Sequence, residues 1–156
     1  MAKTISELNS LSLSKIGKLF YTLSPIDVSE LNALYRAEFI GPLWLRITAG
    51  PALSLTGLRG WWGKEFVEST IAYNLVATDS GRIPKLQMAI GMAPSPFDGK
   101  RTVQLTYSFD APIPWRYVTD ELRWLDERRI LAMTYVNRPL FYRIAFPFLL
   151  SQQENN

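Results

Sequence analysis

A succession of short apolar segments separated by turns runs from residue 61 to residue 151, and this pattern limits the fold more than any other feature. In residues 102–109, Val103, Leu105, Tyr107 and Phe109 alternate with polar side chains, as in a strand with one buried face. We expect strands at 61–67, 70–78, 83–92, 102–109, 115–125, 129–136 and 144–151. Strands at this spacing are typical of an antiparallel barrel or sandwich.

The N-terminal third differs in its periodicity. Apolar residues recur at helical spacing in residues 12–23, and Pro25 follows, so a short amphipathic helix is predicted there. Residues 33–40 alternate and predict another strand. Residues 43–57 show no clean period: a helix broken near Gly50 and a long hairpin insertion both fit, and the helix is favoured.

These elements predict a mainly β chain that forms an antiparallel up-and-down β-barrel of about eight strands, with an N-terminal helix and a helical insertion near 43–57. Closing the sheet removes its exposed edges, and a barrel of this size has room for side chains or one small ligand. No repeat or linker divides the sequence, so one domain over residues 1–156 is expected, ending in a polar tail at 152–156.

Several kinds of chemistry are excluded by composition. The chain has no cysteine and no histidine, which removes thiol nucleophiles, Ser-His triads and the commonest zinc ligands. Its acidic residues are scattered and no glycine-rich phosphate motif is present, so we expect neither a metal site nor a cofactor. The formal charge of +3 is too small to indicate a nucleic-acid partner.

The sequence also carries information on location. The first residues lack the apolar core of a secretory signal, so a cytoplasmic protein is expected. The most apolar stretches, 43–58 and 140–150, are shorter than the roughly 20 residues that a spanning helix needs. Integral membrane insertion is therefore not expected, whereas peripheral contact with a membrane is compatible with the sequence.

One segment carries a resemblance to a known family. Residues 60–66, Gly-Trp-Trp-Gly-Lys-Glu-Phe, resemble the GWxGKxF signature of the GXWXG-type family, bacterial proteins of largely unknown function. Residues 118–126, 130–133 and 146–150 resemble its C-terminal motifs. The name-giving Gly-x-Trp-x-Gly would fall in residues 32–41, where Tyr35 replaces the Trp and the flanking glycines are missing. The resemblance implies a lipocalin-like or calycin-like barrel and offers no settled activity.

Large side chains at inward positions of separate strands are the candidates for a ligand cavity. They are Tyr35, Trp62, Lys64, Tyr73, Met88, Tyr107 and Met133. The same residues would also suit a tightly packed core, because aromatic rings and Met fill cores and pockets alike. Lys64 shares its strand parity with Trp62 and Phe66, so it either faces the interior or lies at the rim with its ammonium group in water.

Asp120 lies at the same parity as Val118, Leu122 and Trp124, which predicts a carboxylate on an apolar face. Such a group must be paired or protonated, so Asp120 and Lys64 are the candidate catalytic residues, and an ion pair of Asp120 with Arg36 or Lys64 is the structural alternative. Arg123 beside Trp124, together with Arg36, is expected to act as a structural latch over one end of the barrel.

Three hypotheses about function follow. The first is binding of an apolar or amphipathic small molecule, fatty-acid-like or isoprenoid-like, with Lys64, Arg36 or Arg123 at its polar end. The second is a cofactor-independent isomerase, cyclase or dehydratase that uses one interior acid or base. The third is an interaction protein with a packed barrel and no ligand. A buried Lys64–Asp120 contact would favour catalysis, and a wholly apolar cavity would favour binding.

Overall fold

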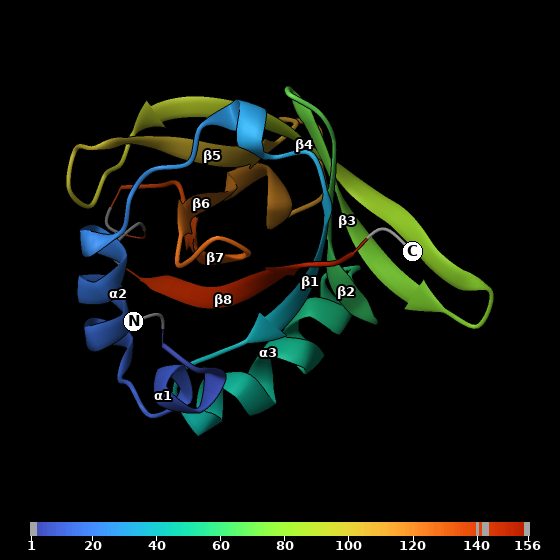
Figure 1. Ribbon diagram of the computed structural model, residues 1–156. Coiled ribbons are helices and arrows are strands. Elements are labelled where there is room, and N and C mark those ends of the chain that lie inside the picture. The colour runs from blue at the N-terminus through green and yellow to red at the C-terminus, as the bar shows by residue number, and fades with distance from the viewer. Residues whose placement is uncertain (1–2, 140, 142–143, 155–156) are drawn as a thin grey trace.

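The computed structural model describes residues 3–139, 141 and 144–154. Its strands form a closed barrel in which each strand pairs antiparallel with the strand before it (Figure 1). The strands are β1 (Leu34–Phe39), β2 (Trp61–Glu68), β3 (Ile71–Thr78), β4 (Gly81–Pro94), β5 (Arg101–Tyr107), β6 (Val118–Trp124), β7 (Arg129–Val136) and β8 (Ala145–Gln152). The predicted eight-stranded up-and-down barrel is confirmed.

The barrel closes between its first and last strands. Tyr35 pairs with Gln152 and Phe39 with Phe148, and three residue pairs between them complete the seam. Alternate side chains then face a shared interior, where the main hydrophobic core lies. In β5, for example, Val103, Leu105 and Tyr107 belong to this core. No strand of the barrel is left with an unpaired edge along the seam.

Two helices cover the outside of β7 and β8. Helix α1 (Ile5–Asn9) is short, and α2 (Leu13–Thr22) begins at Ser12, whose hydroxyl accepts a hydrogen bond from the backbone of Lys15. The predicted helix at 12–23 is confirmed, whereas α1 carries no periodic signal long enough to predict. A second apolar cluster fills the space between these helices and the strands: Leu8, Ile16, Phe20, Ile40, Leu131, Met133 and Leu149.

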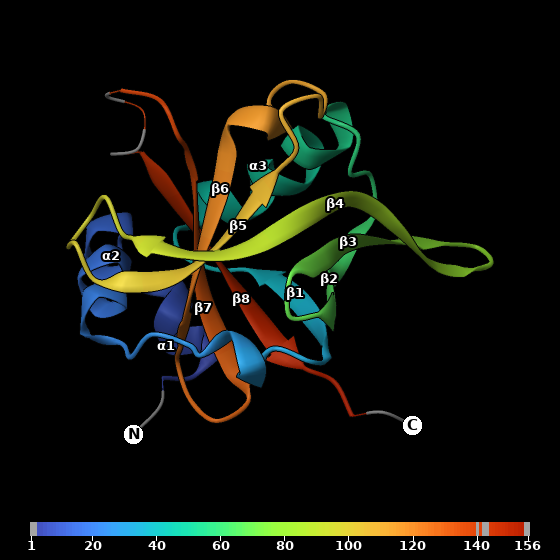
Figure 2. The same ribbon diagram turned by 90° about the horizontal axis from the view of Figure 1, so that it is seen from above.

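Residues 43–57, for which two interpretations were open, form a helix. Helix α3 (Leu43–Leu55) connects β1 to β2 and lies at the end of the barrel where β1 ends (Figures 1 and 2). Pro51 lies inside the helix without ending it. Leu45 is the only buried residue of α3. One side of the helix faces the barrel interior and the other faces solvent. The mixed surroundings explain why the segment lacks a clean apolar period.

Several boundaries differ from the prediction. β5 ends at Tyr107, so Phe109, which was expected on the buried face of this strand, is exposed instead. Residues 115–117 form a short 3-10 helix, η2 (Trp115–Tyr117), so β6 begins only at Val118. Gln152 belongs to β8 rather than to a polar tail, because its backbone pairs with β1. A second 3-10 helix, η1 (Val28–Glu30), precedes β1. Leu140, Tyr142, Arg143 and the last two residues lie outside the described residues.

A bulge near the start of β2 decides which side chains enter the barrel. The pairing register with β3 shifts between Trp61 and Gly63, so that Trp61 and Lys64 both face the interior while Trp62 faces outward. Gly63 also allows β1 and β2 to approach closely, since a Cβ there would overlap the carbonyl oxygen of Tyr35. The bulge thus brings the Lys64 side chain into the core.

Candidate functional site

A cavity of about 290 Å³ lies inside the barrel beneath α3. Helix α3 covers it with one face, and β1, β2, β3, β5, β6, β7 and β8 form its walls. Most of the lining side chains are apolar or aromatic: Phe39, Trp44, Leu45, Ala49, Ala52, Leu53, Leu58, Trp61, Trp115, Phe146, Pro147 and Phe148. The polar ones are Thr48, Lys64, Asn74, Tyr107, Asp120 and Thr134. All but Thr48 come from the strands.

A buried ion pair lies on the cavity wall. The Nζ atom of Lys64 lies 2.9 Å from Oδ2 of Asp120, and the side chains are only 2% and 5% exposed. Thr134 donates a hydrogen bond of 2.6 Å to the other carboxylate oxygen. A carboxylate removed from water needs such partners to stay ionised. Lys64 and Asp120 therefore form one neutral unit, fixed by β7 through Thr134.

Asn74 of β3 connects the ion pair to a tyrosine. Its Oδ1 accepts a hydrogen bond of 2.8 Å from Lys64, and its Nδ2 donates one of 2.8 Å to the Tyr107 hydroxyl. The Trp61 indole donates to the same Oδ1 at 3.1 Å. The side chains of this network come from β2, β3, β5, β6 and β7, so its geometry depends on the barrel as a whole.

The Tyr107 hydroxyl is a neutral hydrogen-bond donor. Burial raises its pKa well above the ordinary value of 10, and the nearby Asp120 charge raises it further, while the Asn74 hydrogen bond acts in the opposite direction. The hydroxyl oxygen accepts from Asn74, and within the described residues no acceptor is found for its own proton. Because Tyr107 lines the cavity, this proton is available to a bound molecule.

Aromatic rings surround the Lys64 ammonium group. Its Nζ lies 5.6 Å from the centre of the Trp61 ring and 5.5 Å from that of Phe148, and the two rings meet edge to face. Ring faces stabilise a cation without neutralising it. The sulfur of Met88 lies 3.3 Å from the same nitrogen. The position of the ammonium group is thus fixed by its neighbours in the barrel wall, without a ligand.

The structure brings three of the predicted site residues to the cavity: Lys64, Tyr107 and Asp120. Of the two alternatives weighed for Asp120, the ion pair with Lys64 is the one present. Tyr35 and Met88 also face inward but are fully buried away from the cavity. Tyr35 packs edge to face on Phe66, and burial raises its pKa to about 12.

Three residues predicted to line the interior lie on the outer face instead, and that prediction is wrong for them. The β2 bulge turns Trp62 outward, where the guanidinium groups of Arg36 and Arg82 lie over its ring. Tyr73 follows Ala72 in β3, and it is Ala72 that belongs to the core, so the Tyr73 hydroxyl reaches Gln87 at the surface. Met133 packs under α1 and α2. Their spacing along the strands had indicated inward positions, but the bulge in β2 and the actual parity of β3 and β7 place them outside.

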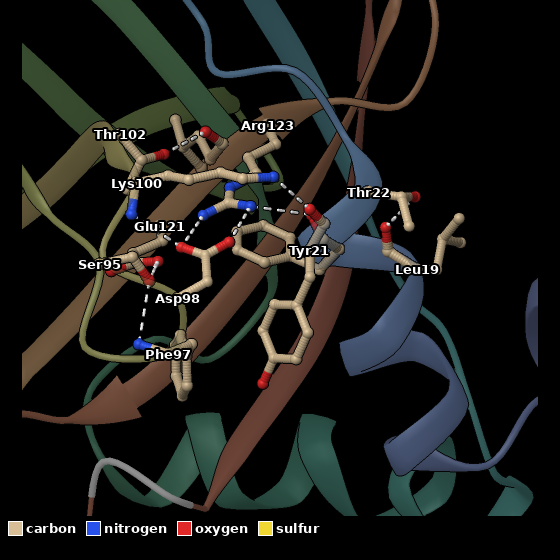
Figure 3. Close-up of polar contacts among 12 residues, drawn as sticks. Leu19, Tyr21, Thr22, Ser95, Phe97, Asp98, Lys100, Thr102, Glu121 and Arg123 are labelled. Atoms are coloured by element: carbon tan, nitrogen blue, oxygen red, sulfur yellow. Dashed lines mark hydrogen bonds and ion pairs between the residues drawn. The ribbon is translucent and has the colours of Figure 1, made fainter.

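The predicted latch residues are separated from one another. Arg36 remains at the surface on Trp62. Trp124 is partly buried and packs against the main core, and its indole donates to Glu30 at 2.9 Å, which ties β6 to η1. Arg123 faces outward, pairs with Asp98 through two hydrogen bonds of 2.8 and 2.9 Å, and lies over the ring of Phe20 (Figure 3). Arg123 therefore fixes α2 and the β4–β5 loop to the barrel wall rather than closing an end.

A second buried polar cluster lies beside Arg123 on the outer wall (Figure 3). Glu121 is fully buried and accepts hydrogen bonds from Ser95 at 2.8 Å, Gln104 at 3.0 Å and Tyr135 at 3.2 Å. Burial raises the Glu121 pKa above its ordinary value, although these hydrogen bonds partly counteract the effect. The hydrogen bonds of Arg123 hold the Asp98 pKa below its ordinary value. The cluster anchors the β4–β5 loop and does not reach the cavity.

Sequence reasoning missed four residues that shape the site. Asn74 and Thr134 were hidden among β-branched and apolar neighbours, although each lies at the inward parity of its strand and a polar residue there is a usable signal. Trp61 was missed because of the bulge. Trp115 contributes from η2, and its indole donates to the Thr56 carbonyl oxygen at 2.6 Å. This last contact joins the β5–β6 connection to the end of α3.

Two further features of the described residues bear on function. Within residues 3–139, 141 and 144–154, no three acidic side chains gather in a way that could hold a metal ion. In the same part of the chain, no helix has both the length and the apolar character needed to cross a membrane.

Comparisons with known proteins show the fold but no family. No family model matches the chain, and no curated protein matches it. A crystal structure of a protein from Thermomonospora curvata is similar, with a TM-score of 0.73 at 13% sequence identity. The similarity covers 96% of this chain and 93% of that one. At this identity the likeness shows a shared barrel architecture alone.

Proposed function

We propose that the protein binds an amphipathic small molecule with an apolar body in the cavity beneath α3. The observation that carries this proposal is the distribution of polarity in the cavity wall. Apolar side chains surround most of the space, and the polar strand residues belong to one connected network around Lys64 and Asp120. A pocket with an apolar wall and a few convergent polar groups is the usual form of a small-molecule site.

The volume limits the size of the ligand. One water molecule occupies roughly 30 Å³ in the liquid, so a cavity of about 290 Å³ holds roughly ten non-hydrogen atoms. This suits an isoprenoid of roughly ten carbons or a fatty chain of similar length better than a long-chain lipid. A cavity of this volume also counts against the hypothesis of a fully packed barrel without a ligand.

The network favours a neutral polar group at the end of the ligand. Asp120 already neutralises Lys64, so an ionised carboxylate placed there would lie close to a second buried carboxylate. The Tyr107 hydroxyl offers a proton to a ligand oxygen. We therefore favour an isoprenoid-like or fatty alcohol, aldehyde or ketone over an ionised fatty acid. Arg36 and Arg123 take no part, since both lie on the outer wall.

A second candidate function is acid–base catalysis without a cofactor, as in an isomerase, cyclase or dehydratase. It is favoured by the meeting of Lys64, Tyr107 and Asp120, from three different strands, at the cavity inside the barrel. Tyr107 would polarise a ligand oxygen, and Asp120 would accept a proton from the neighbouring carbon. Both Asp120 oxygens are already engaged, and this gives binding the preference.

We further propose a distant relationship to the GXWXG-type family. Support comes from the segment that resembles its signature, because Lys64 and Phe66 of this segment are both buried and Gly63 lies at the β2 bulge. The segment thus carries a backbone irregularity as well as the interior lysine.

Binding is tested by tryptophan fluorescence, since Trp44, Trp61 and Trp115 line the cavity. Titration with n-decanol is expected to change the emission of the protein in a saturable way. Ala49→Phe places a ring in the cavity from α3 and should abolish the response. The matched control is Ala89→Phe, on the exposed face of β4, which should respond as the unmodified protein does. A response that survives Ala49→Phe unchanged would refute a site beneath α3.

Catalysis is tested separately by incubating the protein with a ten-carbon unsaturated ketone in deuterated water. Acid–base chemistry would place deuterium next to the carbonyl, and Asp120→Asn would stop this exchange while Ala89→Phe would not. Saturable binding without exchange above the protein-free rate would leave binding as the function and set the enzyme hypothesis aside.

A further inference from the structure

Exposed apolar side chains gather at one end of the molecule. Of thirteen large apolar residues that are exposed in the described part of the chain, nine lie on α3, on the β5–β6 and β7–β8 connections, or at the start of β8. They are Leu43, Trp44, Ile47, Leu55, Phe109, Ile113, Phe141, Ile144 and Phe146. Figure 2 shows α3 and these two connections on the same side of the barrel. A large cluster of exposed apolar side chains is uncommon on a protein surface and usually marks a site of contact with another molecule or a membrane.

Helix α3 has two apolar faces. Leu45 and Leu53 face the cavity, whereas Ile47 and Leu55 are 62% and 90% exposed and take no part in its lining. The only charged residue in the helix is Arg46. A surface helix that serves only to cover a barrel would carry polar side chains on its outer face. The outer face of α3 is therefore suited to an apolar or interfacial environment.

Charge separates the two ends of the barrel. The connections at the α3 end carry four described arginines, Arg46, Arg59, Arg116 and Arg138, against two aspartates, Asp79 and Asp110. The connections and chain ends at the opposite end carry six acidic residues, Asp27, Glu30, Asp98, Asp126, Glu127 and Glu154, against Lys3, Lys100 and Arg128. Ion pairs with Arg123 and Arg129 neutralise Asp98 and Asp126, so this end is close to neutral. The apolar end is thus the basic end, and the opposite end has few exposed apolar side chains among its described residues.

We propose that the α3 end of the barrel docks on the surface of a lipid bilayer that contains anionic lipids. Exposed aliphatic and aromatic side chains would enter the boundary between headgroups and acyl chains, and the surrounding arginines would contact lipid phosphates. The opposite end, where acidic and basic residues nearly balance, would point away from the bilayer. Exposed apolar side chains and arginines occur together on α3 and on the β5–β6 and β7–β8 connections. A bilayer with anionic lipids offers an apolar interior and phosphate groups over the same broad surface, so this combination selects a bilayer as the occupant.

Docking also gives the cavity an entrance from the membrane. Trp44 and Phe146 line the cavity and are at the same time partly exposed at this end, 54% and 37% respectively. An apolar molecule dissolved in the bilayer would then pass between α3 and β8 without crossing water. This route rests on the proposed function, whereas docking itself rests only on the exposed side chains and the charges.

The test is co-sedimentation with vesicles of phosphatidylcholine, alone or with one third phosphatidylglycerol. The protein should bind the anionic vesicles about tenfold more tightly than the neutral ones. The double variant Ile47→Glu/Leu55→Glu should lose binding to both, since it places charge in the apolar face. The matched control is Val67→Glu, an exposed apolar position (55%) at the other end of the barrel, which should bind as the unmodified protein does.

A second pair of variants tests the role of charge. Arg59→Glu should remove most of the preference for anionic vesicles, and Arg101→Glu, exposed at the opposite end, should leave it intact. Circular dichroism and melting curves check that each variant is folded. Unmodified protein that stays in the supernatant with both kinds of vesicle overturns the docking proposal, as does equal loss in Val67→Glu.

The decanol titration keeps the two proposals apart. Ile47→Glu/Leu55→Glu should still show the tryptophan response, because neither residue lines the cavity. Failure of docking with an intact response would leave the binding function standing. Vesicle binding without any decanol response would support docking and refute the cavity as a site for this class of ligand.

Discussion

Lys64 and Asp120 form an ion pair of 2.9 Å across the interior of the barrel, between strands β2 and β6, which are not neighbours in the sheet. The pair therefore bridges opposite walls. Two charges in this position attract each other strongly, but both have lost their hydration. Removing one of them leaves the other buried without a partner.

Lys64→Met is expected to lower the free energy of unfolding by about 3–5 kcal/mol, because Asp120 is then buried and unpaired. The double variant Lys64→Met/Asp120→Leu should recover most of this loss, since the cost comes from the unpaired charge. Urea denaturation of the single and double variants measures both values. A double variant at least as unstable as Lys64→Met would show that the pair itself holds the walls together.

Tyr107→Phe is expected to weaken binding of n-decanol about tenfold, because the ligand hydroxyl loses one hydrogen bond. Binding of n-decane, which has no hydroxyl group, should be unchanged. Tryptophan fluorescence titrations with the two molecules give the comparison. Since burial holds the Tyr107 pKa well above 10, the affinity of the unmodified protein for decanol should be constant across neutral pH. An equal effect on decane would indicate a loss of shape rather than of a donor.

Asp98→Asn should destabilise the protein by about 3 kcal/mol at neutral pH, because Arg123 is fully buried and loses its counterion. The Asp98 pKa is lowered from 3.8 in the folded protein, so its stabilising effect is complete above that value. The effect disappears as the pH falls through the lowered pKa. Unfolding curves should therefore converge for the two proteins in strong acid, and a constant difference would contradict the ion pair as the cause.

Glu121→Gln should have the opposite pH dependence. The Glu121 pKa is raised above 4.5 by burial, so its contribution to stability is complete below that value and is lost as the pH rises through the raised pKa. The unmodified protein should thus lose stability relative to Glu121→Gln above pH 4.5, and the variant should be at least as stable at neutral pH. Urea denaturation over this pH range is the measurement. A variant that is less stable at every pH by the same amount would mean that the hydrogen bonds dominate.

Gly63→Ala should lower the free energy of unfolding by about 3 kcal/mol or more, because the added methyl group would overlap the Tyr35 carbonyl oxygen and push β1 from β2. Gly91→Ala is the matched control in β4, where a Cβ meets nothing within 4 Å. It should be neutral or slightly stabilising. Thermal melting of the two variants gives the comparison, and equal melting temperatures would remove the close approach at Gly63 as a constraint.

The strands could be predicted because a half-buried strand leaves a period of two in the sequence. Val103, Leu105 and Tyr107 show this period, and all three are in the core. The same parity placed Asp120 in the interior, where its contact with Lys64 is found. Regular alternation was therefore enough to predict the closed barrel and the interior position of Asp120.

The remaining site residues depended on features without a local pattern. The bulge at Trp61 reverses the parity of Trp62, and a single inserted residue of this kind has no fixed sequence signal. The strand spacing of Tyr73 and Met133 was interpreted as inward-facing, but β3 and β7 contain runs of consecutive buried residues that hide the parity, and Ala72 and Ala132 take the inward positions. The helix at 43–57 was favoured over a hairpin, but its sequence does not say which face covers the cavity, because a helix exposed on one side and apolar on both gives no period.

The seam between β1 and β8 has a consequence for biosynthesis. A chain emerging from the ribosome holds residues 34–39 long before residues 145–152 appear, so the wall stays open until β8 has been synthesised. Until then the sheet has two unpaired edges, and the charged residues that later lie inside the barrel are exposed to water. A nascent chain halted before residue 145 is therefore a natural client for chaperones.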